Sequence, residues 1–240
     1  PIPRFSEAWA DLMAGGRAGR LLAAVALGTM GFAMQDILLE PYGGEVLGLS
    51  VAATTALTGI WSFGALAGFA AAARWLARGV DPALLAAWAA VSGTFAFAMV
   101  IFSAPMESPA LFRCGAFAIG FGSGLFGVSG LTAAMALGRG TAARGGAGLA
   151  LGAWGAATAT ATGLGVLAGG LLKDLIETVA MTGRLGEAMA SPVVGYSAVW
   201  HVEIALLFVT IVIIGPLVRK APRAATPRES DRFGLAEFPT

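Results

Sequence analysis

Two carboxylates near the end of the first long apolar segment have the type and spacing to do chemistry. Residues 35–40 read QDILLE, so Asp36 and Glu40 are four residues apart and share one face of a predicted helix. Like charges at this spacing repel unless a cation intervenes or one carboxyl is protonated. We predict that Arg113, the cation expected at matching depth, forms a salt bridge with Asp36 or Glu40. The alternative is that this acidic helix end simply reaches the lipid headgroups.

A second polar cluster contains the single histidine of the chain, in the run Trp200-His201-Val202-Glu203. A neutral imidazole is a common metal ligand, and the magnesium of a (bacterio)chlorophyll ring is one metal that His201 would suit. Glu203 is two residues further along the helix, so it faces nearly the opposite side and cannot share that metal. The alternative reading is an interfacial histidine beside a tryptophan of the aromatic belt, and the interface preference of such rings favours it.

The composition identifies the kind of chain that must position these groups. Of 240 residues, 57% are hydrophobic and only 12% are charged, whereas a soluble domain is about a quarter charged. The formal net charge of +1 leaves no field to attract a polyanion, so we expect no nucleic-acid partner. The single cysteine excludes a disulfide framework and a cysteine-based zinc site. No P-loop, HExxH or nucleophile-elbow motif is present, so we expect no enzyme and no protein-ligated metal. These features predict an all-α polytopic membrane protein.

Six segments are long and apolar enough for transmembrane helices of about 20 residues. They are residues 21–39, 51–76, 82–102, 111–137, 147–172 and 198–218. We therefore divide the chain into an N-terminal segment (1–17), a six-helix bundle (18–219) and a disordered tail (220–240) rich in proline and charge. The connection over residues 173–192 mixes apolar and charged residues, which predicts an amphipathic helix on the outer surface.

The positions of the basic residues predict the orientation. Twelve of the 15 lysines and arginines flank the same ends of the predicted spans, and the other ends hold only Arg113, Lys173 and Arg184. Because cytoplasmic loops carry the excess of basic residues, we expect both termini in the cytoplasm.

Glycines recur four residues apart within the predicted spans. The pairs are Gly64 and Gly68, Gly120 and Gly124, Gly148 and Gly152, and Gly165 and Gly169. This spacing lets helix backbones approach closely in lipid. We interpret it mainly as tight helix packing; sliding contacts of a transporter-like bundle are the alternative.

The stretch from Met34 to Leu49 (MQDILLEPYGGEVLGL), followed by TTALT at residues 54–58, resembles the PucC/LhaA family. The resemblance runs from about Arg17 to Lys220. Members of that family are major-facilitator-like membrane proteins with twelve spans in two six-helix halves. The chain resembles the carboxy-terminal half of such a bundle, which implies a second six-helix half or another copy as partner.

The resemblance implies a function. Family members assist the assembly of photosynthetic light-harvesting complexes and are thought to deliver or chaperone bacteriochlorophyll. It therefore implies a non-enzymatic assembly factor in the bacterial inner, intracytoplasmic photosynthetic membrane, with antenna polypeptides as partners and bacteriochlorophyll as the bound or transferred cofactor. A proton-coupled solute transporter of the major facilitator type, using Asp36, Glu40 or Glu203, is the alternative. The candidate functional residues are Gln35, Asp36, Glu40, Pro41, Tyr42, Gly43, Gly44 and Glu45 of the motif, with Arg113, His201 and Glu203.

Overall fold

The computed structural model describes residues 4–14, 16–139 and 146–218, and all regular elements in these ranges are helices. The α-helices are α1 (Phe5–Met13), α2 (Arg17–Ala33), α3 (Leu39–Glu45), α4 (Val51–Ala77), α5 (Pro82–Ser103), α6 (Pro109–Arg139), α7 (Gly146–Met181) and α8 (Val193–Ile214). Three short 3-10 helices are η1 (Met34–Ile37), η2 (Glu187–Met189) and η3 (Gly215–Leu217). The tail predicted for residues 220–240 lies outside the described residues.

Five helical segments in the described ranges are long and apolar enough to cross a membrane. They are Arg17–Glu45, Val51–Ala77, Pro82–Ser103, Pro109–Gly138 and Pro192–Leu217. The prediction of an all-α polytopic membrane protein is confirmed, but the count is five where six were expected. The sixth predicted segment, residues 147–172, is helical within α7 but is not among the five. It is the first part of a 36-residue helix, because α7 runs on through charged residues to Met181.

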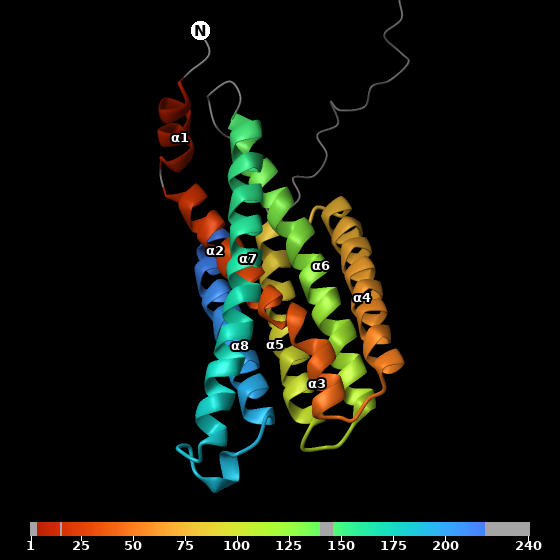
Figure 1. Ribbon diagram of the computed structural model, residues 1–240. Coiled ribbons are helices and arrows are strands. Elements are labelled where there is room, and N and C mark those ends of the chain that lie inside the picture. The colour runs from red at the N-terminus through yellow and green to blue at the C-terminus, as the bar shows by residue number, and fades with distance from the viewer. Residues whose placement is uncertain (1–3, 15, 140–145, 219–240) are drawn as a thin grey trace, which may run out of the picture.

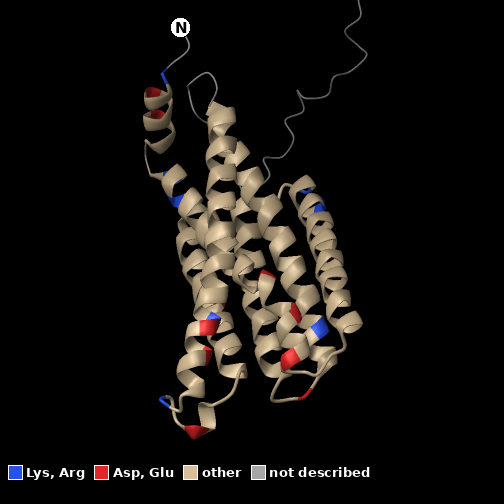
Figure 2. Ribbon diagram, in the orientation of Figure 1, with Lys and Arg blue, Asp and Glu red and all other residues tan. Residues whose placement is uncertain are grey.

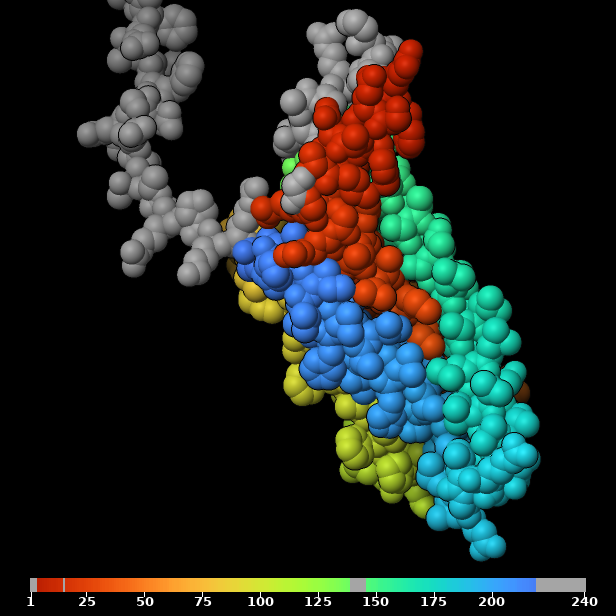
Figure 3. Space-filling view, turned by 90° about the vertical axis from the view of Figure 1, so that its left-hand side faces the viewer, coloured from red at the N-terminus to blue at the C-terminus, as the bar shows by residue number. Residues whose placement is uncertain are grey.

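The long helices alternate in direction, so the start of α2 and the end of α8 lie at the same end of the bundle (Figure 1). Arg17 connects these two ends, because its Nη2 donates a hydrogen bond to the carbonyl of Leu217 at 3.1 Å. Helix α2 is central and contacts α6, α7 and α8, whereas α4 packs mainly on α6. On the face shown in Figure 3, α8 lies between α7 and α5.

Most of the charged residues are found toward the two ends of the bundle, as the coloured ribbon of Figure 2 shows. The starts and stops of the helices follow local capping chemistry. The Oδ1 atom of Asp81 accepts from the amides of Ala83 (2.8 Å) and Leu84 (3.1 Å), and Pro82 occupies the first turn of α5. The chain leaves α4 at Gly79, whose φ of +81° favours glycine.

Two of the predicted glycine pairs join α4 to α6. A Cβ at Gly64 or Gly68 would lie 2.1 or 2.2 Å from a carbonyl oxygen of α6, and one at Gly120 or Gly124 would lie 2.0 or 2.3 Å from a carbonyl oxygen of α4. The two helices are therefore in backbone contact, as the packing interpretation predicts.

The two glycine pairs on α7 behave differently from each other. Gly165 and Gly169 approach the backbone of Met30 and Met34, where a Cβ would lie 3.0 and 2.4 Å from the carbonyl oxygens. Nothing lies within 4 Å of the Cβ position of Gly148 or Gly152. The glycine spacing alone does not distinguish these two environments.

Candidate functional site

The first span is broken in the middle of the bundle, and the predicted motif begins at the break. Helix α2 ends at Ala33, the chain forms η1, and α3 then leaves in a new direction (Figure 1). The side chain of Gln35 supports the break: its Nε2 donates to the carbonyl of Phe32 at 3.3 Å and also to Oδ1 of Asp36. A backbone carbonyl freed in an apolar environment needs such a partner. The broken span therefore explains a buried carboxamide inside an apolar run.

Asp36 and Glu40 do not share a helix face, because η1 holds one and α3 the other. Asp36 accepts from Gln35, whereas Glu40 accepts a hydrogen bond from Oγ1 of Thr58 on α4. The predicted salt bridge from Arg113 is absent. In the described part of the chain both ion pairs belong to Lys173, and Arg113 is exposed near the start of α6. The break removes the like-charge spacing on which the salt-bridge prediction depended.

The second half of the motif connects the first span to its neighbours. Tyr42 is fully buried, and its ring lies 4.4 Å from Trp200, 5.2 Å from Phe112 and 5.4 Å from Tyr196, measured between ring centroids. Glu45 accepts a hydrogen bond of 2.7 Å from the hydroxyl of Tyr196. These contacts give the Tyr42–Glu45 segment a structural role.

The glycines and the proline of the motif have separate roles. Gly43 is packed so closely that a Cβ would lie 3.1 Å from the ring of Phe112 and 3.3 Å from Leu57. Gly44 faces open space, and Pro41 is exposed. The motif therefore does not form one continuous surface.

Lys173 completes a charged cluster at this end of the bundle. Its Nζ lies 2.6 Å from Glu177, 3.4 Å from Asp174 and 4.9 Å from the ring centroid of Tyr196. Burial lowers the pKa of Lys173, but the hydrogen bond and charge of Glu177, with the charge of Glu45, raise it, and the net direction is upward. This lysine stays charged at neutral pH, and it joins α7 to Tyr196 of α8, the residue that donates to Glu45.

His201 and Glu203 face opposite environments on α8. Glu203 is 0% exposed, and its carboxylate has no hydrogen-bond partner among the described residues. It lies beside Gln35 and within range of the charge of Asp36. His201 is exposed on the outer face of the bundle.

The imidazole of His201 has a defined orientation. Its Nδ1 lies 2.7 Å from the carbonyl oxygen of Ser197 one turn earlier. A carbonyl only accepts, so Nδ1 carries the proton, and in the neutral ring Nε2 is the nitrogen whose lone pair is available to a ligand. Hydrogen bonding at one ring nitrogen orients the other as a ligand, which is the arrangement that metal-binding histidines use.

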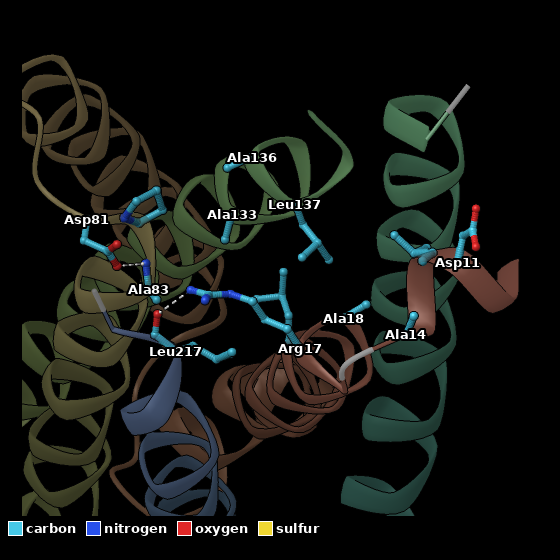
Figure 4. A pocket seen from close by; sticks show the side chains of 13 residues that line it. Asp11, Ala14, Arg17, Ala18, Asp81, Ala83, Ala133, Ala136, Leu137 and Leu217 are labelled. Carbon is cyan, nitrogen blue, oxygen red and sulfur yellow. Dashed lines mark hydrogen bonds between the residues drawn. The ribbon is translucent and has the colours of Figure 1, made fainter. Parts of the chain in front are cut away.

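Two cavities complete the set of candidate sites. A pocket of about 530 Å³ lies at the end of the bundle where the chain enters α2, between α1, α2, α5, α6 and η3. Figure 4 shows the Arg17 side chain extending across it to Leu217, while Asp81 is engaged with the first turn of α5.

The second cavity, which we call the central cleft, has a volume of about 250 Å³ and lies beside the break in the first span. Its lining residues are Thr29, Phe32, Ala33, Asp36, Trp61, Ser123, Phe126, Gly127, Trp154, Thr158 and Thr162. They come from α2, η1, α4, α6 and α7. Sequence reasoning identified Asp36 but missed the break and the cleft. The carboxamide of Gln35 within an apolar run was the available signal for both.

Comparison with known protein families supports the resemblance. The family model described as PUCC protein matches residues 1–221. A Rhodobacter capsulatus protein described as an uncharacterized protein in the puhA-bchM intergenic region is 49% identical over 244 residues, which cover 100% of this chain and 50% of that protein. Protein PucC of Rhodovulum sulfidophilum is 49% identical over 177 residues, covering 74% of this chain and 38% of the relative.

A more distant relative, the bacteriochlorophyll synthase 44.5 kDa chain of Rhodobacter capsulatus, is 30% identical over 179 residues, 73% of this chain and 41% of that protein. The chain thus spans half or less of the length of each of these relatives. No solved structure matches the chain.

Proposed function

Because the chain belongs to the PUCC protein family, we propose that it is a membrane assembly factor for photosynthetic light-harvesting complexes, which binds antenna polypeptides, delivers bacteriochlorophyll, or does both. The family assignment supplies the photosynthetic context. The chemistry that a pigment or an antenna helix needs must come from residues on the outside of the bundle.

The orientation of His201 is the observation that carries this proposal. Among the described residues, no group of three or more His, Cys, Asp or Glu side chains is placed to hold a free metal ion. A magnesium already held within a tetrapyrrole would need one further ligand from the protein, and the imidazole of His201 would supply it. The free Nε2 of His201 fits this requirement, and the bound pigment would supply light absorption without any change in the protein's covalent chemistry.

The exposed surface of α8 that follows His201 in the sequence suits an apolar ligand. Ala205, Phe208 and Val212 follow at helical spacing and are exposed, with Val212 74% and Phe208 57% accessible. Small Ala205 leaves room for a flat ring one turn from the imidazole. The larger apolar residues further along would contact a hydrocarbon tail or an antenna helix.

We further propose that the chain lies in the bacterial inner, intracytoplasmic photosynthetic membrane, with both termini in the cytoplasm and a second six-helix half or another copy beside it. The alternating helices place the two ends of the described chain together, and Arg17, Arg20, Arg74 and Arg78 lie at that end. The relatives are about twice as long as the matched region, and Gly148, Gly152, Gly155 and Gly163 of α7 face open space. Such an open glycine-rich face suits a further helix bundle.

The second candidate function is a proton-coupled solute transporter. The observation that favours it is the broken first span, which places Asp36 at the central cleft; in transporters, broken helices and intramembrane carboxylates mark substrate and ion sites. The other two carboxylates considered for this role do not line the cleft. Glu40 is exposed and accepts a hydrogen bond from Thr58, and the carboxylate of Glu203 has no hydrogen-bond partner in the described chain. Proton-driven uptake into vesicles that is lost in Asp36→Asn would support this candidate.

A pigment-binding titration tests the leading proposal. The purified chain in lipid nanodiscs is titrated with bacteriochlorophyll, and axial ligation is followed by absorption and resonance Raman spectroscopy. We expect saturable binding, weakened at least tenfold by His201→Ala and restored in His201→Gly by added imidazole. Thr160→Ala, at an exposed position on α7, is the matched control and leaves binding unchanged.

Equal pigment binding by His201→Ala and the unchanged chain would refute the assignment of His201. Copurification with antenna polypeptides, measured in the same nanodiscs, tests the polypeptide partner separately. A chain that binds neither pigment nor antenna polypeptide would refute the assembly role.

A further inference from the structure

The central cleft contains one charged group and has no cation to balance it. Asp36 is the only ionisable residue of the lining, and no lysine or arginine is among the lining residues. One carboxylate oxygen accepts from Gln35, and neither forms an ion pair with any residue in the described ranges. Asp36 is an exposed residue of this lining, so its carboxylate is open to a ligand, and a carboxylate within a membrane-spanning segment is stabilised by a positive charge beside it.

The walls of the cleft are aromatic. Trp61, Trp154, Phe32 and Phe126 line it from four different helices. The indole nitrogens of Trp61 and Trp154 are themselves buried and make no hydrogen bond within the described chain, so they do not open onto the cleft. The Nε1 atom of Trp154 lies against α6, 3.5 Å from the Cβ position of Gly130. The cleft therefore meets the ring carbons and not the indole N–H groups of these two tryptophans, and the face of an aromatic ring attracts a cation.

Hydroxyl groups supply the remaining polarity. Thr29, Ser123 and Thr162 line the cleft and make no side-chain hydrogen bond to other described residues, whereas Thr158 already donates to the carbonyls of Trp154 and Gly155. A bare metal ion does not suit this lining, because a single carboxylate and scattered hydroxyls provide too few strong ligands. An organic cation needs only a counter-charge and aromatic surface.

We propose that the central cleft binds a small organic cation of the substituted-ammonium class, with Asp36 as its counter-ion and Trp61, Trp154, Phe32 and Phe126 as its aromatic walls. The volume of about 250 Å³ suits such a ligand, since a cavity of about 150 Å³ holds one benzene. This site is separate from His201, which lies on the outer face of α8, and it does not depend on pigment binding.

Competition binding with a charged probe and its neutral isostere tests the proposal. The chain in nanodiscs is equilibrated with tritiated benzyltrimethylammonium, and unlabelled benzyltrimethylammonium or neopentylbenzene is added. The two competitors have the same shape and differ in charge. We expect saturable binding that the cation displaces at concentrations at least tenfold lower than the neutral compound.

Matched variants identify the residues responsible. Asp36→Asn keeps the shape of the side chain and is expected to weaken cation binding at least tenfold, while Trp154→Leu weakens it through loss of an aromatic wall. Glu107→Gln removes a carboxylate from an exposed loop and leaves binding unchanged. His201→Ala is also expected to leave cation binding unchanged. Failure of the cation proposal and failure of the pigment proposal are therefore distinguishable. Helical circular dichroism establishes that each variant is folded.

Absence of saturable cation binding, or equal displacement by the neutral isostere, would overturn the proposal. Unchanged affinity in folded Asp36→Asn would overturn the role of Asp36 as counter-ion.

Discussion

Gln35 shows how one polar side chain allows a broken helix to exist inside an apolar bundle. Its carboxamide donates to the carbonyl of Phe32 and to the carboxylate of Asp36, and it is buried. A hydrocarbon side chain of similar size would leave the carbonyl without this donor and the carboxylate without its neighbour. In an apolar environment, each polar group left without a hydrogen-bond partner costs its full desolvation free energy.

We therefore predict that Gln35→Leu lowers the free energy of unfolding by about 1–3 kcal/mol. Thermal and denaturant unfolding of the purified chain in detergent measures this loss. Thr132→Val is the matched control, because the Thr132 hydroxyl donates to the Val128 carbonyl within the continuous helix α6. We expect Thr132→Val to lower the free energy of unfolding by less than Gln35→Leu does. Equal destabilisation by the two variants would show that the Gln35 hydrogen bonds do not support the break.

At the scale of helices, the sequence located most of the elements but not their irregularities. The apolar segments at 51–76, 82–102 and 111–137 match α4, α5 and α6 closely, because length and hydropathy define a membrane helix. The break at residues 34–37 was not predicted, since a 3-10 turn and an α-helix share the same apolar composition. The prediction of a salt bridge from Arg113 to Asp36 or Glu40 was wrong for the same reason, because it assumed a continuous helix through these two carboxylates.

The connection after the fifth predicted span shows a related error. An amphipathic helix was predicted for residues 173–192, whereas α7 continues to Met181 and the rest forms turns and η2. No glycine or proline interrupts the chain between Leu172 and Thr182, so the helix has no reason to stop. Gly183, with φ of +74°, is the first residue that redirects it.

The contact between α4 and α6 gives a prediction about helix packing. A methyl group at Gly124 would lie 2.3 Å from the carbonyl oxygen of Ala65, so Gly124→Ala must push the helices apart. We expect a loss of about 1–3 kcal/mol in the free energy of unfolding. Gly155→Ala is the matched control, because nothing lies within 4 Å of that Cβ position and alanine favours the helix. Denaturant unfolding of both variants in the same detergent measures the difference, and equal stability would contradict the close backbone contact.

At the scale of the whole molecule, the alternating helices determine which loops share a side. The turn after α4, at residues 78–81, lies at the same end as the start of α2, whereas the turn after α5, at residues 104–108, lies at the opposite end (Figure 1). The arginines at the first end predict that it is cytoplasmic. Each of these two turns has an exposed charged residue, Arg78 and Glu107, that tolerates replacement without loss of core packing.

Cysteine labelling of these two turns tests the proposed orientation. The chain has one cysteine, the exposed Cys114, so Cys114→Ser gives a background in which one new thiol is placed at a time. In intact cells we expect a membrane-impermeant maleimide to label Glu107→Cys and not Arg78→Cys, because only the turn at residues 104–108 faces outward. In inside-out vesicles the labelling is expected to reverse, which controls for reactivity of the two thiols. Labelling of Arg78→Cys in intact cells would invert the topology, and labelling of both variants from one side would contradict the alternation of the helices.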